Sequence, residues 1–166
     1  MVVPKVGLTG ANFIDRLIDP TVKLGTSTPK ADPAGDYTWA MFHQIDALRP
    51  GSYAILDKKA QQIVGGPTNN ANFGGKDPAV AAFADGRIDL FVGYCTGAKR
   101  LLAQMPQLQV TEVPRELAAG PEYGLAVLKG SDLCTPDFAL FMLSPSGQQI
   151  FADYGFAPVA FPALGH

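Results

Sequence analysis

One segment constrains the fold of this chain more than any other. Residues Ile88–Tyr94 form a nearly uninterrupted apolar run that is bounded by turn-forming residues. A short run of this kind is typical of a strand buried on both faces, as in parallel sheets that carry helices on each side. Helical patterns flank it along the chain, at 36–48 and at 97–104. The alternation predicts an α/β fold with three layers and a mainly parallel sheet.

Capping residues and prolines mark where the helices begin. Asp77-Pro78, Thr135-Pro136 and Ser144-Pro145 each pair a capping residue with a proline that suits the first helical position. Thr9 is a further candidate cap, and Gly155 is placed to end the last helix. We expect helices at 9–20, 36–48, 52–62, 77–86 and 97–104, two more from 135 and 144, and strands at 22–25, 88–94, 108–113 and 123–128.

Composition excludes several classes of protein. The 166 residues carry a formal net charge of -2 and no basic run, so we expect no nucleic-acid partner. Apolar residues make up 47% of the chain, which is too many for a disordered protein. No apolar stretch approaches the roughly 18 residues of a membrane-spanning helix, so we expect no membrane insertion.

The start of the chain and the cysteines leave its compartment open. Residues Met1–Lys5 do not begin a signal peptide, which fits a mature secreted protein, a cytoplasmic protein or a trimmed chain equally. Cys95 and Cys134 are too few for a disulfide scaffold. Two buried thiols are favoured over a bridge between them, but their pairing stays undecided.

Catalysis has little support in the sequence, and we expect no enzyme. His43 lies within a helical pattern and His166 ends the chain, and neither has partners at metal-ligand spacing. Cys95 and Ser146 lack an evident base. The segment Gly74-Gly75-Lys76 resembles the end of a phosphate-binding loop, but the surrounding pattern fails at two positions.

Two loops are candidate ligand sites. The loop 25–37 carries three neighbouring hydroxyls and leads into a helix, whose free backbone N–H groups and positive dipole end suit an anion. The loop 93–97 follows the buried strand, and ligands of open α/β sheets lie beyond the carboxyl ends of strands. Taken alone, each loop fits an ordinary connection at least as well.

The motifs in combination resemble a family. They are Gly25-Thr26-Ser27-Thr28-Pro29, Ala31-Asp32-Pro33-Ala34-Gly35-Asp36-Tyr37, the strand ending in Val92-Gly93-Tyr94, Glu122-Tyr123-Gly124-Leu125-Ala126-Val127, and the tail from Ser144 to Phe156. Together they are similar to the molybdate-binding proteins of ABC importers. One departure is that the separate D-P and P-A-G elements of the family are condensed here into Asp32-Pro33-Ala34-Gly35.

The resemblance implies a type II periplasmic binding fold, in which two lobes hold molybdate or tungstate by neutral donors without a cofactor. By position, the donor at the helix start is Ala34 or Gly35, the donor at the strand exit is the backbone of Gly93, and the hinge hydroxyl is Tyr123. The predicted site also includes the neighbouring Ser27 and Tyr37. The absence of a basic residue at these positions fits a cradle of backbone N–H groups.

The resemblance also implies an incomplete molecule. Family members begin with a further segment that forms most of the first lobe and supplies two serine ligands. We therefore expect a complete central lobe at 21–113, with 1–20 and 114–166 forming the hinge and a remnant of the other lobe. The last two helices would then expose apolar side chains, so we expect a homo-oligomer in which they pack against another copy.

The expected function is that of a solute-binding protein, or a truncated relative of one, which binds a small oxoanion for an ABC permease. The resemblance places it in the periplasm, although the sequence leaves the cytoplasm open. The alternative is a domain that keeps the fold but does not transport, and that instead self-associates or senses a ligand.

Overall fold

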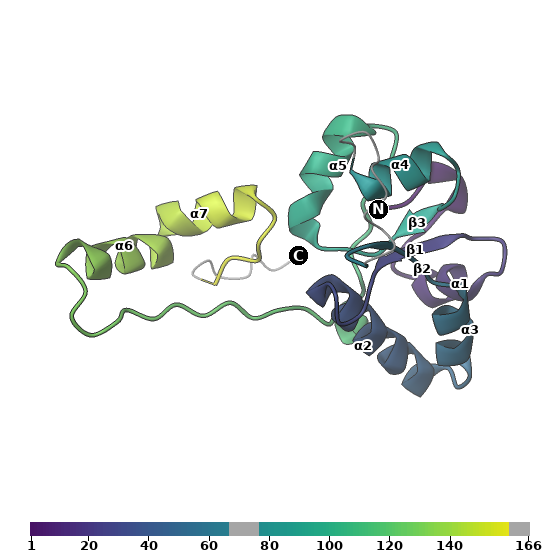
Figure 1. Cartoon of the computed structure of the whole chain (residues 1–166), viewed down its shortest axis with the longest axis horizontal. Coiled ribbons are helices and arrows are strands. Elements are labelled where there is room, and N and C mark those ends of the chain that lie inside the picture. The colour runs from purple at the N-terminus through teal and green to yellow at the C-terminus, as the bar shows by residue number, and fades with distance from the viewer. Residues whose placement is uncertain (67–76, 160–166) are drawn as a thin grey trace. The chain divides into compact units, whose positions relative to one another are not determined.

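The computed structural model describes residues 1–66 and 77–159, and the chain divides into two compact units, Met1–Gly120 and Pro121–His166 (Figure 1). The first unit contains η1 (Pro4–Val6), α1 (Phe13–Ile18), β1 (Leu24–Ser27), α2 (Pro33–Leu48), α3 (Ser52–Lys59), β2 (Gln61–Val64), α4 (Pro78–Ala84), β3 (Leu90–Phe91), η2 (Cys95–Gly97), α5 (Ala98–Gln104) and η3 (Arg115–Leu117). The second unit contains α6 (Cys134–Leu143) and α7 (Pro145–Asp153).

The first unit is built on a parallel sheet of three strands in the order β2-β1-β3. In the central strand β1, Gly25 lies opposite Gln61 of β2 and Phe91 of β3. Val2 forms antiparallel bridges to Leu90 and to Gln109, beside β3. The parallel sheet predicted from the sequence is therefore confirmed.

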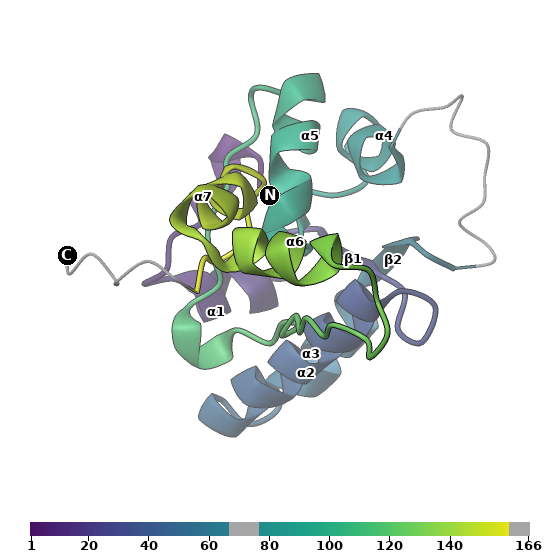
Figure 2. The same ribbon diagram turned by 90° about the vertical axis from the view of Figure 1, so that its left-hand side faces the viewer.

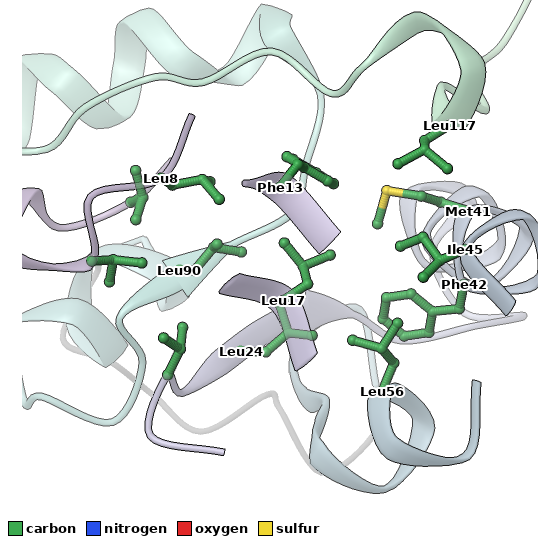
Figure 3. Close-up of a cluster of buried hydrophobic side chains, with 13 residues drawn as sticks. Leu8, Phe13, Leu17, Leu24, Met41, Phe42, Ile45, Leu56, Leu90 and Leu117 are labelled. Atoms are coloured by element: carbon green, nitrogen blue, oxygen red, sulfur yellow. The ribbon is translucent and has the colours of Figure 1, made fainter. Parts of the chain in front are cut away.

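Each face of the sheet is covered by its own apolar cluster. Leu24 and Leu90 belong to a cluster formed with α1, α2 and α3, where Leu17, Phe42 and Leu56 are completely buried (Figure 3). Burying a side chain of this size stabilises the fold by about 1.5–3 kcal/mol. Figure 2 shows α2 and α3 side by side in this layer.

The opposite face packs against α4 and α5. Ile63 and Phe91 belong to this second cluster, together with Phe83 and Leu101 from the helices. Leu90 and Phe91 are neighbours on one strand and face opposite layers, which explains why both of these positions are apolar. The first unit therefore has the predicted three layers, with helices on both faces of the sheet (Figure 1).

Several element boundaries differ from the sequence prediction. α2 begins at Pro33 instead of Asp36, because the side chain of Asp32 caps the helix. β1 covers 24–27 instead of 22–25. α3 ends at Lys59, and the residues predicted as its last turn form β2, because they pair with β1.

The strands predicted at 108–113 and 123–128 do not form. Among the described residues of these segments, only Gln109 takes part in a bridge. A β-prone segment becomes a strand only where a neighbouring strand receives its backbone hydrogen bonds. Residues 121–128 have no such neighbour in the described part of the chain.

The predicted caps had mixed outcomes. Asp77 and Ser144 accept hydrogen bonds from the first turns of α4 and α7, as predicted. α6 begins at Cys134, and Asp132 receives the N–H groups of its first two residues at 2.9 and 3.0 Å. Thr9 and Asn12 exchange hydrogen bonds just before α1, so Thr9 closes the preceding turn and does not cap the helix.

The prediction of buried thiols was wrong, because Cys95 and Cys134 are both exposed and free. His43 stacks on Tyr53 with ring centroids 4.3 Å apart, which is a structural contact. The Gly74–Lys76 segment and His166 lie outside the described residues. None of the helices in the described ranges is long and apolar enough to cross a membrane.

The second unit contains both aromatic and polar contacts, and the rings of Tyr123 and Phe151 each pack against Phe156. The Gln148 amide donates to the Met142 carbonyl at 2.8 Å and accepts from the Val159 N–H at 2.7 Å. Within α6 no residue is buried. Its exposed apolar side chains include Phe138, Leu140, Phe141 and Leu143.

The first unit extends beyond the lobe predicted at 21–113. Val2, Val6, Leu8, Phe13 and Leu17 are buried in its first core cluster. Leu117, within η3, closes the same cluster. Residues 1–20 and 114–120 therefore belong to this compact unit, and the assignment of flanking segments to a second lobe stays a prediction.

Candidate functional site

A cavity of about 360 Å³ lies in the first unit, where all three parallel strands end. Ser27 is the last residue of β1, Val64 the last of β2 and Phe91 the last of β3, and all three line the cavity. Ligands of open α/β sheets bind beyond the carboxyl ends of the strands. The topology therefore makes this cavity the candidate site.

Three helical segments begin at the same cavity. Ala34 lies in the first turn of α2, Ala79 in the first turn of α4, and Thr96 within η2, which leads into α5. Helix N-termini present backbone N–H groups and a positive partial charge. Of these elements α2 is the longest, with 16 residues, so its N-terminus carries the most developed dipole.

Ser27 brings an unused hydroxyl to the cavity. Ser27 is only 3% exposed, and no described residue is hydrogen-bonded to its hydroxyl. No fully enclosed side-chain oxygen in the described chain lacks a partner, so the Ser27 oxygen keeps some accessible surface, and Ser27 lines the cavity. A buried hydroxyl of this kind is ready to bond a ligand.

Ala34 lines the cavity, but its N–H is already engaged. It donates to Oδ1 of Asp32 at 2.9 Å, which is the N-cap hydrogen bond of α2. Asp32 also lines the cavity. A ligand that used the Ala34 N–H would therefore have to take the place of this carboxylate oxygen.

Gly35 serves the loop and does not line the cavity. A Cβ at this position would lie 2.5 Å from the backbone carbon of Thr28, so only glycine lets α2 approach the preceding loop. Its N–H donates to the Asp32 carbonyl at 2.9 Å. Gly35 thus helps to position Asp32, which both caps α2 and lines the cavity.

The strand exit supplies the other predicted donor. Gly93 lines the cavity, and its N–H makes no hydrogen bond to a described residue. The next residue, Tyr94, also lines the cavity, and its ring meets that of Tyr37 edge-on with centroids 6.3 Å apart. Tyr37 therefore contacts a residue of the lining but does not itself line the cavity.

Tyr123 belongs to the second unit. It is 72% exposed, and its ring packs against Phe156 with centroids 5.5 Å apart. Of the six residues predicted for the site, the structure brings Ser27, Ala34 and Gly93 to one cavity. Gly35 and Tyr37 do not line it but contact Asp32 and Tyr94, which do. The role of Tyr123 stays a prediction.

The sequence prediction missed the charged residues of the cavity. Asp32, Asp77, Arg100 and Glu112 all line it. Arg100 forms an ion pair with Asp77, which also caps α4. The Asp77-Pro78 pattern was visible as a helix start. Only the topology shows that the start of α4 lies at the same cavity as the starts of α2 and η2. In the described part of the chain, no group of three acidic, histidine or cysteine side chains is placed to hold a metal ion.

Comparison with known proteins identifies the family. The model of the family described as bacterial extracellular solute-binding protein matches residues 1–157. The chain therefore belongs to the bacterial extracellular solute-binding proteins. Membership in this family, together with the cavity at the sheet edge, indicates a binding role more than a catalytic one.

One relative is an uncharacterized protein of Pasteurella multocida (strain Pm70). It is 36% identical over 147 residues, which cover 89% of this chain and 60% of the relative. The chain thus spans about 60% of the length of the curated relative it matches. No solved structure matches the chain.

Proposed function

We propose that the first unit binds a small tetrahedral oxoanion, molybdate or tungstate, in the cavity at the carboxyl edge of the sheet. The observation that carries the proposal is the hydroxyl of Ser27, which has no protein partner, on a buried residue that lines the cavity beside the N-terminus of α2. The Gly93 N–H is a second unused donor at the same cavity. Hydroxyl and backbone donors at a helix start suit an oxoanion.

The choice of molybdate or tungstate rests on the sequence resemblance. In that assignment Ser27, Ala34 and Gly93 bind the ligand directly. Gly35 holds the loop that carries Ser27 and Ala34, and Tyr37 packs against Tyr94 at the strand exit. The resemblance also assigns a hydroxyl ligand to Tyr123. The protein needs no cofactor for this function, since the oxoanion is its ligand.

We further propose that the whole protein delivers the oxoanion to an ABC permease in the periplasm. The family description as extracellular solute-binding proteins supports this role. The alternative is a domain that self-associates or senses the ligand without transport. The exposed apolar side chains of α6 favour that alternative, because such surfaces commonly mark interaction sites.

Ser27→Ala tests the proposed site directly. The substitution removes no protein hydrogen bond, so we expect the free energy of unfolding to change little. A hydrogen bond to a charged ligand contributes about 1.5–3 kcal/mol, so the Kd for molybdate should rise roughly tenfold to hundredfold. Isothermal titration calorimetry measures this Kd directly.

Ser52→Ala is the matched control. Ser52 is equally buried, at 2% exposure, but it lies at the start of α3 and does not line the cavity. The control should bind molybdate as the unmodified chain does. Equal affinity of the Ser27→Ala variant and the unmodified chain would remove Ser27 from the site.

A further inference from the structure

Asp32 places a negative charge inside the candidate oxoanion site. Its side chain lines the cavity, and Oδ1 accepts the Ala34 N–H at 2.9 Å. Its backbone is fixed as well, because its N–H donates to the Thr28 carbonyl and its carbonyl accepts the Gly35 N–H, both at 2.9 Å. A carboxylate is thus fixed at the positive end of α2, where an oxoanion would bind.

The neighbouring loop restricts where this side chain can go. Gly65 has a φ of +86°, and a Cβ at this position would lie 2.6 Å from Cβ of Asp32. The backbone after β2 therefore packs directly against Asp32. The carboxylate cannot withdraw in that direction, so it stays within reach of a ligand in the cavity.

No cation neutralises Asp32 in the described part of the chain. The described ion pairs include Asp77, which is paired with Arg100, but none includes Asp32. The charge of Asp77 at the cavity is therefore compensated, whereas that of Asp32 is balanced only by the helix end. An oxoanion that enters the cavity meets the Asp32 charge at short range.

We propose that Asp32 is an internal competitor for the oxoanion: its carboxylate occupies the Ala34 N–H until the ligand replaces it. The inference rests on the proposed function and names the residue that sets the affinity of that site. Ser27 offers the first contact, and the ligand then exchanges with Oδ1 at the N-terminus of α2. The repulsion makes the site bind doubly charged oxoanions more weakly than its donors alone would allow.

Asp32→Asn tests the proposal. Asparagine caps a helix about as well as aspartate, so α2 should keep its start while the charge is lost. We expect the Kd for molybdate to fall about tenfold or more. The gain should depend on ligand charge: perrhenate, a tetrahedral ion of single charge, should gain only about threefold, because half the charge halves the repulsive free energy.

Asp36→Asn is the matched control. Asp36 lies in the first turn of the same helix, where its side chain accepts the Lys30 N–H at 2.9 Å, and it does not line the cavity. This variant removes the same charge from the same helix, so its Kd for molybdate should stay within about twofold of the original, since exposed charges are screened. Asp32→Ser replaces Asp32→Asn if the asparagine variant fails to fold.

The outcomes separate this inference from the proposed function. If the unmodified chain binds molybdate and Asp32→Asn leaves the affinity unchanged or lowers it, Asp32 is not a competitor, although the site stands. An equal gain for molybdate and perrhenate would also overturn the inference, because it would not follow ligand charge. If neither the unmodified chain nor any variant binds molybdate, tungstate or perrhenate, the proposed function itself fails.

Discussion

Asp89 is a buried charge that holds three segments of the first unit together. Its carboxylate contacts the Lys5 ammonium at 2.8 Å and accepts the Lys23 N–H at 3.0 Å. Burial raises the pKa of Asp89, but the hydrogen bonds and charges of Lys5 and Lys23 outweigh burial and place the pKa below the ordinary 3.8. The ionised form is therefore the one that the folded chain stabilises.

Asp89→Asn should weaken the fold in a manner that depends on pH. A hydrogen bond to a charged group contributes about 1.5–3 kcal/mol, and we expect a loss of this order in the free energy of unfolding at neutral pH. Because the folded pKa is depressed, the contribution of Asp89 is fully present above pH 3.8 and disappears as the pH falls through the folded pKa. Urea unfolding at several pH values measures it. A deficit that stays constant down to the acid limit would contradict this account.

Individual residues of the site were predictable where backbone donors carry the argument. Ser27, Ala34 and Gly93 follow from two loops at the ends of strands, and the structure brings them to one cavity. Asp32 was misjudged for a local reason. The helix was expected to begin at Asp36, whereas the hydrogen bond from Ala34 shows that Asp32 is the cap. Asp32-Pro33 pairs a capping residue with a proline in the first turn, as Asp77-Pro78 does, so the local signal was present in the sequence and was overlooked.

At the scale of elements, the start of α2 depends on contact with the loop before it. Gly35→Ala would place a Cβ 2.5 Å from the backbone of Thr28, and backbone cannot yield as a flexible side chain can. We expect a loss of about 1–3 kcal/mol in the free energy of unfolding, together with weaker molybdate binding. Thermal and urea unfolding measure the first effect, and calorimetry measures the second.

Gly10→Ala provides the comparison for this substitution. Nothing lies within 4 Å of a Cβ built at Gly10, so its free energy of unfolding should change by less than about 0.5 kcal/mol. If both variants were equally stable, the close approach of α2 to its loop would not be what holds the site together.

Most helices and two of the strands could be predicted from the sequence, because their apolar periodicity and caps are local. β2 could not, since Gln61 and Gln62 continue the pattern of α3 and become strand only by pairing with β1. The prediction of a strand at 123–128 was wrong for the opposite reason. Its β-prone residues have no neighbouring strand in the described part of the chain.

At the scale of the whole molecule, the second unit carries the strongest sign of a partner. Among its described residues, Leu133 is 93% exposed and Phe138 is 63% exposed. The sequence predicted that these helices pack against another copy of the chain. We therefore expect light scattering to give a molecular mass that rises with concentration toward that of a dimer or larger oligomer.

Leu133→Lys combined with Phe138→Lys should reduce that association, because a charge in an apolar interface is costly to desolvate. Leu48→Lys is the control, since Leu48 is 63% exposed on α2 of the first unit. A stable monomer at all concentrations would contradict self-association. The exposed apolar side chains of the second unit would then be expected to contact a partner other than a second copy of this chain.

The central claim is that the cavity at the sheet edge binds molybdate or tungstate, and thermal unfolding with added oxoanion tests it most directly. A ligand that binds only the folded state stabilises it by about 2.7 kcal/mol at a free concentration about 100 times its Kd. We predict that molybdate and tungstate raise the Tm, that sulfate raises it less, and that Ser27→Ala weakens the shift. An unchanged Tm at millimolar molybdate and tungstate would contradict the claim.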